Sequence, residues 1–268
     1  MPLQLINGQW INYEDTGGHL EPVVLAHGLL MDQEMFAPQI EALAPGCRVV
    51  TWDARCHGLT ETTQDPFTYW NLADDLKGLL DHLDIDRAVI GGMSQGGSVA
   101  LRFALQHPER VSALILIATH AGIEDARIAA IYAGILDAWE SDGLDDQLAE
   151  KIAGVILGTA WTGREEWIAK WHQWPRSLLR RAFQTHLAGE DIQHRLGGIK
   201  APALVIHGTA DGATPMERAQ KLCSDLGNSQ QLVVIEGGGH ACNLTHADLV
   251  NRAVGQFLVE LALKPVPS

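Results

Sequence analysis

The sequence has little positive charge for its length, and this scarcity limits its partners. Across 268 residues, 19 lysines and arginines stand against 33 aspartates and glutamates, which gives a formal net charge of −14. Such a chain repels phosphate backbones and anionic membrane surfaces rather than attracting them. We therefore expect neither nucleic acid nor a membrane as a partner.

Cysteine pairs and long apolar runs are also missing. None of the four cysteines belongs to a C-x-x-C pair, so the sequence predicts neither a zinc site nor a disulfide framework. The longest apolar run, ALILIA at 113–118, is too short to cross a bilayer. The first residues lack the basic segment and apolar stretch that mark a secretory signal. These absences favour a cytoplasmic protein with reduced thiols.

Short β-branched runs alternate with longer amphipathic stretches along the chain. This alternation predicts an α/β fold with a mostly parallel sheet of eight strands and helices on both faces. The expected strands are a hairpin within 3–15, followed by 22–28, 47–53, 87–93, 111–119, 201–210 and 230–236. The expected helices are 34–44, 69–83, 94–107, 214–226 and 247–263. We interpret the last five residues, KPVPS, as a frayed end.

The alternation stops between residues 121 and 199, where several helical patterns follow one another without a strand. We interpret 121–199 as a helical cap inserted into one core, which residues 1–120 and 200–268 form together. Large aromatic side chains line apolar pockets as readily as they pack helices together, and both interpretations stay open here. Five of the eight tryptophans lie in this segment: Trp139, Trp161, Trp167, Trp171 and Trp174.

The stretch GGMSQGG at 91–97 places the pattern G-x-S-x-G between an expected strand and an expected helix. A serine on so tight a turn needs a strained backbone, and Gly92 and Gly96 leave room for neighbouring elements to approach. Ser94 would then project above the sheet, with the Gln95 N–H at a helix N-terminus that favours negative charge. The same pattern also fits a plain N-cap serine.

Polar residues follow three other expected strands. His27 and Gly28 end strand 22–28, where we interpret His27 as a loop-ordering residue, and the Leu29 N–H could be a second oxyanion donor. Asp211 follows strand 201–210, and His240 follows three glycines after the last strand. Seen alone, Asp211 fits an ordinary turn and His240 an ordinary helix start. The order serine, aspartate, histidine is nevertheless the one expected of a hydrolase built on a parallel sheet.

These motifs resemble those of the α/β-hydrolase fold superfamily over nearly the whole chain. The motifs that carry the resemblance are AHG (26–28), DARCHG (53–58), GMSQGG (92–97), HGTADGATP (207–215) and GGGH (237–240). Within the superfamily, the short loops, the cap and segment 189–215 are similar to the 3-oxoadipate enol-lactonase group of lactonases and esterases. Family members often have glycine where Cys56 stands, so a thiol is expected near the loop beside the site.

The resemblance implies an α/β-hydrolase fold and a serine hydrolase mechanism. Ser94 would be the nucleophile, His240 its general base, and Asp211 the residue that fixes the histidine tautomer. The Leu29 and Gln95 N–H groups would hold the oxyanion. The expected substrate is a carboxylic ester or lactone of a medium-sized, hydrophobic small molecule, cleaved through an acyl-enzyme without a metal or organic cofactor. A monomer or homodimer is expected.

Several alternatives stay open at this point. Some relatives carry the acid after the preceding strand, where this chain has Glu124 and Asp125. We interpret Arg55, His57 and His120 as solvated or loop-ordering residues rather than catalytic ones. A similar triad would also serve carbon–carbon bond hydrolysis, perhydrolysis, or a small-ligand receptor that retains it, and the fold does not decide among these functions.

Overall fold

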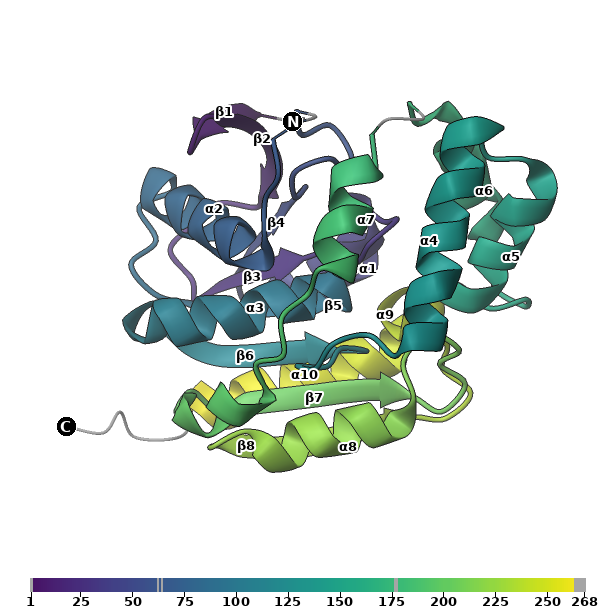
Figure 1. Ribbon diagram of the computed structural model, residues 1–268. Helices are drawn as coiled ribbons and strands as arrows, with labels where there is room; N and C mark the ends of the chain where they lie inside the picture. Colours follow the sequence, from purple (N-terminus) through teal and green to yellow (C-terminus); the bar gives the residue numbers. More distant parts are fainter. Residues whose placement is uncertain (1, 62, 64, 176–177, 263–268) are drawn as a thin grey trace.

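The computed structural model of the protein describes residues 2–61, 63, 65–175 and 178–262; the KPVPS tail lies outside the described residues. Eight strands form one sheet in the order β1-β2-β4-β3-β5-β6-β7-β8 (Figure 1). At one edge of the sheet, β1 (Leu3–Ile6) and β2 (Gln9–Asp15) form an antiparallel hairpin, and β2 also pairs antiparallel with β4 (Arg48–Trp52). The sequence prediction of a mostly parallel eight-stranded sheet is confirmed.

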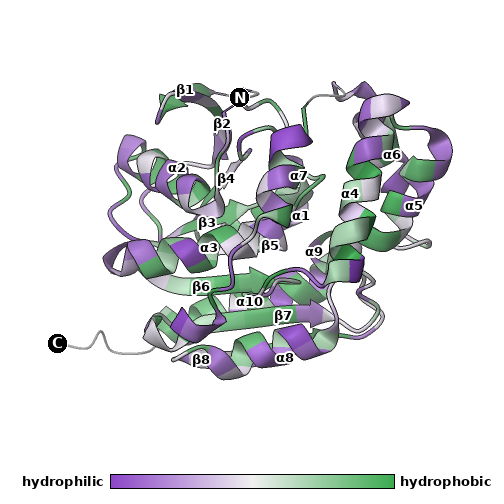
Figure 2. Ribbon diagram, viewed as in Figure 1, coloured by the Kyte–Doolittle hydropathy of each residue, from purple (hydrophilic) through white to green (hydrophobic). Residues whose placement is uncertain are grey.

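The remaining strands are parallel; the inner ones are largely buried on both faces, whereas the last strand, at the edge of the sheet, is partly exposed, with Val234 48% exposed. They are β3 (Pro22–Ala26), β5 (Ala88–Met93), β6 (Val111–Ile117), β7 (Ala203–Gly208) and β8 (Ser229–Ile235). All six residues of β5 and of β7 are buried, as expected of strands covered by helices on both sides. Figure 2 shows these inner strands as mainly hydrophobic, whereas the surface helices alternate between hydrophobic and hydrophilic residues.

Helices cover both faces of the sheet. α1 (Ala37–Leu43), preceded by the short helix η1 (Gln33–Phe36), packs on α10 (Ala247–Ala262), which lies behind the sheet in Figure 1. α2 (Tyr69–His82) packs on α3 (Gln95–Gln106), which lies in front of the sheet together with α8 (Met216–Asp225). The short helix η2 (Pro108–Arg110) packs on α3, and the short helix α9 (Cys242–Thr245) packs on α10, η1 and α1.

The chain between β6 and β7 is helical. It forms α4 (Ala126–Ser141), α5 (Asp146–Ile156), α6 (Arg164–Gln173), α7 (Arg180–Leu187) and the short helix η3 (Gln193–Gly198). Asp125 caps α4 and Asp145 caps α5, since each carboxylate accepts backbone N–H groups of the first turn. Figure 1 shows α4, α5 and α6 grouped to one side of the core. We call α4 to α7 the cap; domain boundaries at 121 and 199 stay a prediction.

Three strands end two residues earlier than the sequence suggests, and all three end at the same edge of the sheet. β3 ends at Ala26 rather than 28, β6 at Ile117 rather than 119, and β7 at Gly208 rather than 210. Ala118, directly after β6, has a φ of 48°, a left-handed conformation that stops strand pairing. The polar residues expected of the site therefore lie on loops beyond the strands.

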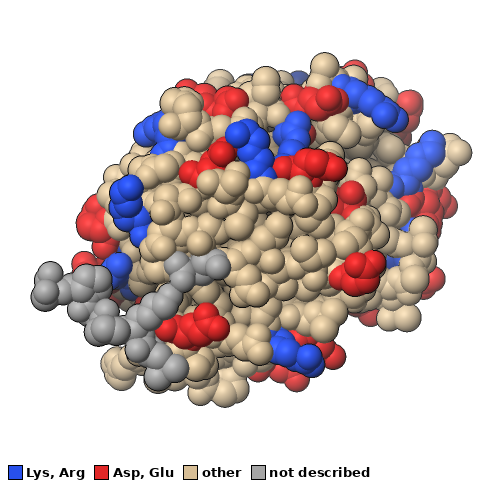
Figure 3. All heavy atoms as spheres, turned by 90° about the horizontal axis from the view of Figure 1, so that it is seen from below, with Lys and Arg blue, Asp and Glu red and all other residues tan. Residues whose placement is uncertain are grey.

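Charge is unevenly spread over the molecule. Seen from below, acidic and basic side chains lie mainly toward the rim of the face, and its centre is largely uncharged (Figure 3). Among the helices of the described residues, none has both the length and the apolar character required to cross a membrane.

Candidate active site

Ser94 occupies the junction between β5 and α3 in a strained conformation. Its φ of 53° and ψ of −114° lie outside the regions that L-residues favour. The Ser94 N–H donates to the Ile117 carbonyl at 2.8 Å, and the Ser94 carbonyl accepts from the Thr119 hydroxyl at 2.7 Å. Hydrogen bonds to the neighbouring strand and its loop therefore hold the backbone of this serine on both sides.

Two glycines make the tight junction possible. A Cβ built on Gly96 would lie 1.9 Å from the Ala26 carbonyl oxygen, and one on Gly92 would lie 2.3 Å from the Gly96 carbonyl carbon. Any side chain at either position would push α3 away from β3 and β5. The glycines thus act as the sequence suggested, by letting the helix approach the strands.

Asp211 and His240, from the loops after β7 and β8, meet at the same edge. The His240 Nδ1 lies 3.0 and 2.9 Å from the two Asp211 carboxylate oxygens. Asp211 Oδ1 also accepts the N–H groups of Ala213 and Thr214, both at 2.8 Å. Burial raises the pKa of Asp211, but His240 and these hydrogen bonds outweigh it and hold the pKa below its usual value. An ionised Asp211 can only accept a hydrogen bond, so a neutral His240 carries its proton on Nδ1 and donates it to the carboxylate. The Nε2 of His240 is then the proton acceptor.

His207, the penultimate residue of β7, supports the Asp211 loop. Its Nε2 lies 2.9 Å from the Thr214 carbonyl, and 3.5 Å from Asp211 Oδ2. The side chain is fully buried, and burial lowers its pKa, so the neutral ring donates from Nε2 to Thr214. The sequence analysis missed this residue, although a histidine near the end of an apolar strand was a visible signal.

The loop after β3 forms a tight turn beside Ser94. The Met31 N–H donates to the Gly28 carbonyl at 3.1 Å, and Leu30 in the turn has a φ of 65°. A Cβ built on Gly28 would lie 3.6 Å from the Ser94 Cβ, which shows how close the two segments are. Within the described chain, the Leu29 N–H has no hydrogen-bond acceptor. The Gln95 N–H opens α3, where the first donors have no partner within the helix.

His27 holds this turn against the neighbouring loop. Its Nε2 accepts the Ala54 N–H at 2.9 Å, so its Nδ1 carries the proton and donates to the Gly28 carbonyl at 2.8 Å. The residue is 1% exposed, and burial lowers its pKa to about 4. His27 is therefore a neutral residue with both ring nitrogens committed to the backbone, which agrees with a loop-ordering role.

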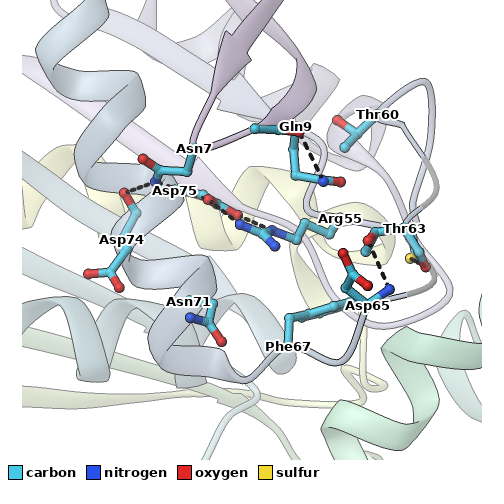
Figure 4. A network of polar contacts seen from close by, with 12 residues as sticks. Asn7, Gln9, Arg55, Thr60, Thr63, Asp65, Phe67, Asn71, Asp74 and Asp75 are labelled. Atoms are coloured by element: carbon cyan, nitrogen blue, oxygen red, sulfur yellow. Dashed lines mark hydrogen bonds and ion pairs between the residues drawn. The ribbon is translucent and has the colours of Figure 1, made fainter.

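Arg55 lies in a separate polar network (Figure 4). Its Nε and Nη2 pair with the Asp75 carboxylate at 2.6 and 2.8 Å, and the Asn7 amide donates to Asp75 Oδ1 at 3.1 Å. These contacts tie the loop after β4 to α2 and the first hairpin. His57 is buried, with its Nδ1 3.0 Å from the Arg55 carbonyl, and the Cys56 thiol donates to the Thr63 carbonyl within the same loop. Arg55, Cys56 and His57 therefore order the loop.

The alternative acids Glu124 and Asp125 do not contact His240. Asp125 caps α4. Glu124 Oε1 lies 2.9 Å from the His120 Nε2, and His120 and its other neighbours hold the pKa of Glu124 low against its burial. His186 from α7 lies 3.5 Å from the same carboxylate oxygen, and its Nδ1 is 2.7 Å from the Tyr69 hydroxyl. Glu124 thus belongs to a second polar cluster.

A small cavity borders Ser94, whereas a much larger groove lies away from it. A cavity of about 20 Å³, room for one water molecule, lies beside Ser94 and Gln95 and is also lined by Tyr69, His120, Glu124 and His186. Tyr69 and His186 were missed because no motif marks them. A groove of about 1070 Å³ is lined mainly by the starts of strands and the end of α10, and none of the predicted site residues borders it.

The cap tryptophans do not line the cavity beside Ser94. Trp139, Trp167 and Trp171 are buried, and Trp171 donates its indole N–H to the Leu30 carbonyl. The described residues contain no group of three or more His, Cys, Asp or Glu side chains arranged to hold a metal ion. All four cysteines carry free thiols.

Comparisons with known proteins match this architecture. The family model described as alpha/beta hydrolase fold matches residues 21–153, and one described as TAP-like protein matches 170–265. A 2-hydroxy-6-oxononadienedioate/2-hydroxy-6-oxononatrienedioate hydrolase from Burkholderia vietnamiensis is 33% identical, over 92% of this chain and 90% of its own. A thermophilic esterase from Thermogutta terrifontis is 27% identical, with a TM-score of 0.86 and 94% coverage of both chains. The enol-lactonase from Burkholderia xenovorans LB400 is 26% identical, with a TM-score of 0.85, over 96% of this chain and 100% of its own.

Proposed function

Because the chain belongs to the α/β-hydrolase fold family, we propose that it is a serine hydrolase that cleaves carboxylic esters or lactones. The observation that carries the proposal is the pair formed by His240 Nδ1 and the buried Asp211 carboxylate at 2.9 Å, at the sheet edge where Ser94 stands on its strained turn. A histidine oriented in this way is a general base for a serine hydroxyl.

Each group takes one role in the reaction. The Ser94 Oγ attacks the carbonyl carbon while His240 Nε2 accepts the hydroxyl proton, and the Leu29 and Gln95 N–H groups stabilise the oxyanion. When the tetrahedral intermediate collapses, His240 returns the proton to the leaving alkoxide, and an acyl-enzyme remains. His240 then takes a proton from water, whose oxygen attacks the acyl carbonyl. When this second tetrahedral intermediate collapses, His240 returns the proton to the Ser94 Oγ, and the acid is released.

The comparisons support an ester or lactone substrate, since the structural relatives include an esterase and an enol-lactonase. A medium-sized, hydrophobic acyl group stays a prediction, because the cap tryptophans do not line the cavity beside Ser94. The mechanism needs no metal or organic cofactor. A cytoplasmic location and a monomeric or homodimeric state stay predictions.

A substrate panel with a serine-directed label tests this function. The protein is assayed with p-nitrophenyl esters and lactones before and after treatment with a fluorophosphonate, and the modified residue is identified by mass spectrometry. We expect loss of activity together with labelling of Ser94, and no labelling of Ser94→Ala. Rapid lactone opening with slow linear esters would indicate a lactonase, and the reverse a general esterase. Turnover that survives complete labelling would exclude the proposed mechanism.

Carbon–carbon bond hydrolysis is the second candidate. The 33% identical relative is named for such a substrate, and polar side chains, among them Tyr69, Arg102 and His120, line the cavity beside Ser94. Decay of the absorbance of a 2-hydroxy-6-oxo-dienoate measures this reaction. A kcat/KM above that of every ester and lactone would make carbon–carbon cleavage the assigned function.

A further inference from the structure

Helix α6 of the cap contacts the turn that carries Leu29. The fully buried Trp171 donates its indole N–H to the Leu30 carbonyl at 2.7 Å. The preceding residue, Lys170, forms ion pairs with Asp32 and, at 2.7 Å, with Glu34. Two consecutive residues of one cap helix therefore hold residues 30–34, a segment that lies about 140 positions earlier in the sequence.

The Trp171 contact reaches the Leu29 N–H through two rigid peptide planes. The Leu30 carbonyl shares a peptide unit with the Met31 N–H, and Met31 donates to the Gly28 carbonyl at 3.1 Å. The Gly28 carbonyl in turn shares a peptide unit with the Leu29 N–H. Because the C=O and N–H of a trans peptide point in opposite directions, fixing the first carbonyl sets the direction of the Leu29 N–H.

The turn depends on support from outside its own residues. Leu30 has a φ of 65° at a turn position that normally takes glycine or asparagine, so the local sequence disfavours this conformation. His27 supports the Gly28 carbonyl from the core side, at 2.8 Å. Trp171 holds the other end of the turn from the cap, and Asp32 anchors the continuation by capping η1.

We propose that Trp171 is a positioning residue, which holds the Leu29 N–H in the oxyanion hole and makes this hole complete only when α6 is docked. The inference rests on the proposed serine hydrolase function. Its consequence is that displacement of the cap opens the site and removes one oxyanion donor at the same time, so chemistry is confined to the docked cap.

Trp171→Phe tests the proposal, since it removes the donor and keeps an aromatic ring. Complete loss of an oxyanion donor lowers kcat by about 10²- to 10³-fold, so a misaligned donor is expected to lower kcat by about tenfold. KM should change less than about twofold. A boronic acid, whose adduct with Ser94 places an oxygen in the hole, should bind about tenfold more weakly. Fluorophosphonate titration of active sites corrects kcat for unfolded protein.

Trp139→Phe is the matched control, because Trp139 is also buried in the cap and has no hydrogen bond to residues 28–32 in the described chain. It should leave kcat and boronate affinity within about twofold of the wild type. An unchanged kcat in Trp171→Phe, or an equal loss in both variants, would overturn the proposal. If Trp171→Phe does not melt cooperatively, Lys170→Gln is used, with a smaller loss of kcat at constant KM expected.

Hydrogen exchange separates this inference from the proposed function. The Met31 amide should exchange at least about fivefold faster in Trp171→Phe than in the wild type, whether or not the protein hydrolyses esters, and Trp139→Phe should not alter it. Unchanged exchange overturns the structural link between α6 and the turn. If Met31 exchanges faster in Trp171→Phe but fluorophosphonate does not label the wild type, the proposed function and the oxyanion role both fall. If fluorophosphonate labels the wild type but Trp171→Phe has the same kinetics as the wild type, only the positioning role falls.

Discussion

The Ser94 junction and the Leu29 turn lie side by side, yet they are stabilised in different ways. Both contain a residue other than glycine at positive φ, 53° at Ser94 and 65° at Leu30. The junction is fixed by the backbone of β6, by the Thr119 hydroxyl in the loop after it and by the close approach of Gly96 to β3, all within the core. The turn is closed by its own hydrogen bond from Met31 to Gly28 and is held by side chains on two sides, His27 from the core and Trp171 from the cap. The first arrangement is rigid by construction, whereas the second depends on a distant helix staying in place.

The largest expected effects come from the junction. Ser94→Ala should lower kcat by about 10³- to 10⁶-fold, and His240→Ala should do the same, because the groups act as one unit. The double variant should be little worse than either single one. Steady-state hydrolysis of a p-nitrophenyl ester measures all three. Losses that multiply in the double variant would show that the two residues act independently.

The next substitution, Asp211→Asn, should lower kcat by about 10⁴-fold and leave the melting curve normal. An amide in place of the ionised carboxylate presents an N–H to His240 Nδ1 and favours the wrong tautomer. Asp125→Asn is the matched control, since asparagine caps a helix as well as aspartate, and it should leave kcat unchanged. Near-normal turnover in Asp211→Asn would move the acid to Glu124 or Asp125.

The contrast between junction and turn also explains what the sequence could predict. The junction was predictable because its signals, an apolar strand, G-x-S-x-G and a helical pattern, lie within about fifteen consecutive residues. Asp211 and His240 follow strands, and parallel strands bring their carboxyl ends to one edge. The bond from Trp171 to Leu30 was not predictable, because helical periodicity shows that a residue is buried and not which carbonyl it meets. Tyr69 and His186 were missed for the same reason.

Two glycine substitutions test whether the core is rigid and the cap more tolerant. Gly96→Ala places a Cβ 1.9 Å from the Ala26 oxygen and should lower the free energy of unfolding by about 3 kcal/mol or more. Gly134 lies inside α4 of the cap, and a Cβ there meets no atom within 4 Å. Gly134→Ala should raise the free energy of unfolding by about 0.5–1 kcal/mol through helix propensity. Urea unfolding measures both, and equal effects would contradict the comparison.

The smallest expected effect is a pH dependence that belongs to the turn region. Asp32 is buried beside Lys170; burial raises its pKa to about 6, above its unfolded value of 3.8. A pKa raised in the folded state means that folding takes up a proton, so the stability linked to Asp32 is present at low pH and is lost as pH rises through about 6.

Comparing Asp32→Asn with the wild type isolates this contribution. Asparagine keeps the cap of η1 but cannot titrate. Between pH 7 and pH 5, the free energy of unfolding of the wild type should rise by about 1 kcal/mol relative to that of Asp32→Asn. Glu34→Gln is the control, because Glu34 binds the same Lys170 from an exposed position; its charge is the smallest influence that raises the pKa of Asp32, so its substitution should reduce the difference between the two pH values far less than Asp32→Asn does. Urea unfolding at both pH values gives the comparison. If the difference in free energy of unfolding between the wild type and Asp32→Asn is the same at both pH values, the Asp32 carboxyl is already ionised at pH 5. The charge of Lys170 on α6 would then lower the pKa of Asp32 more than burial raises it.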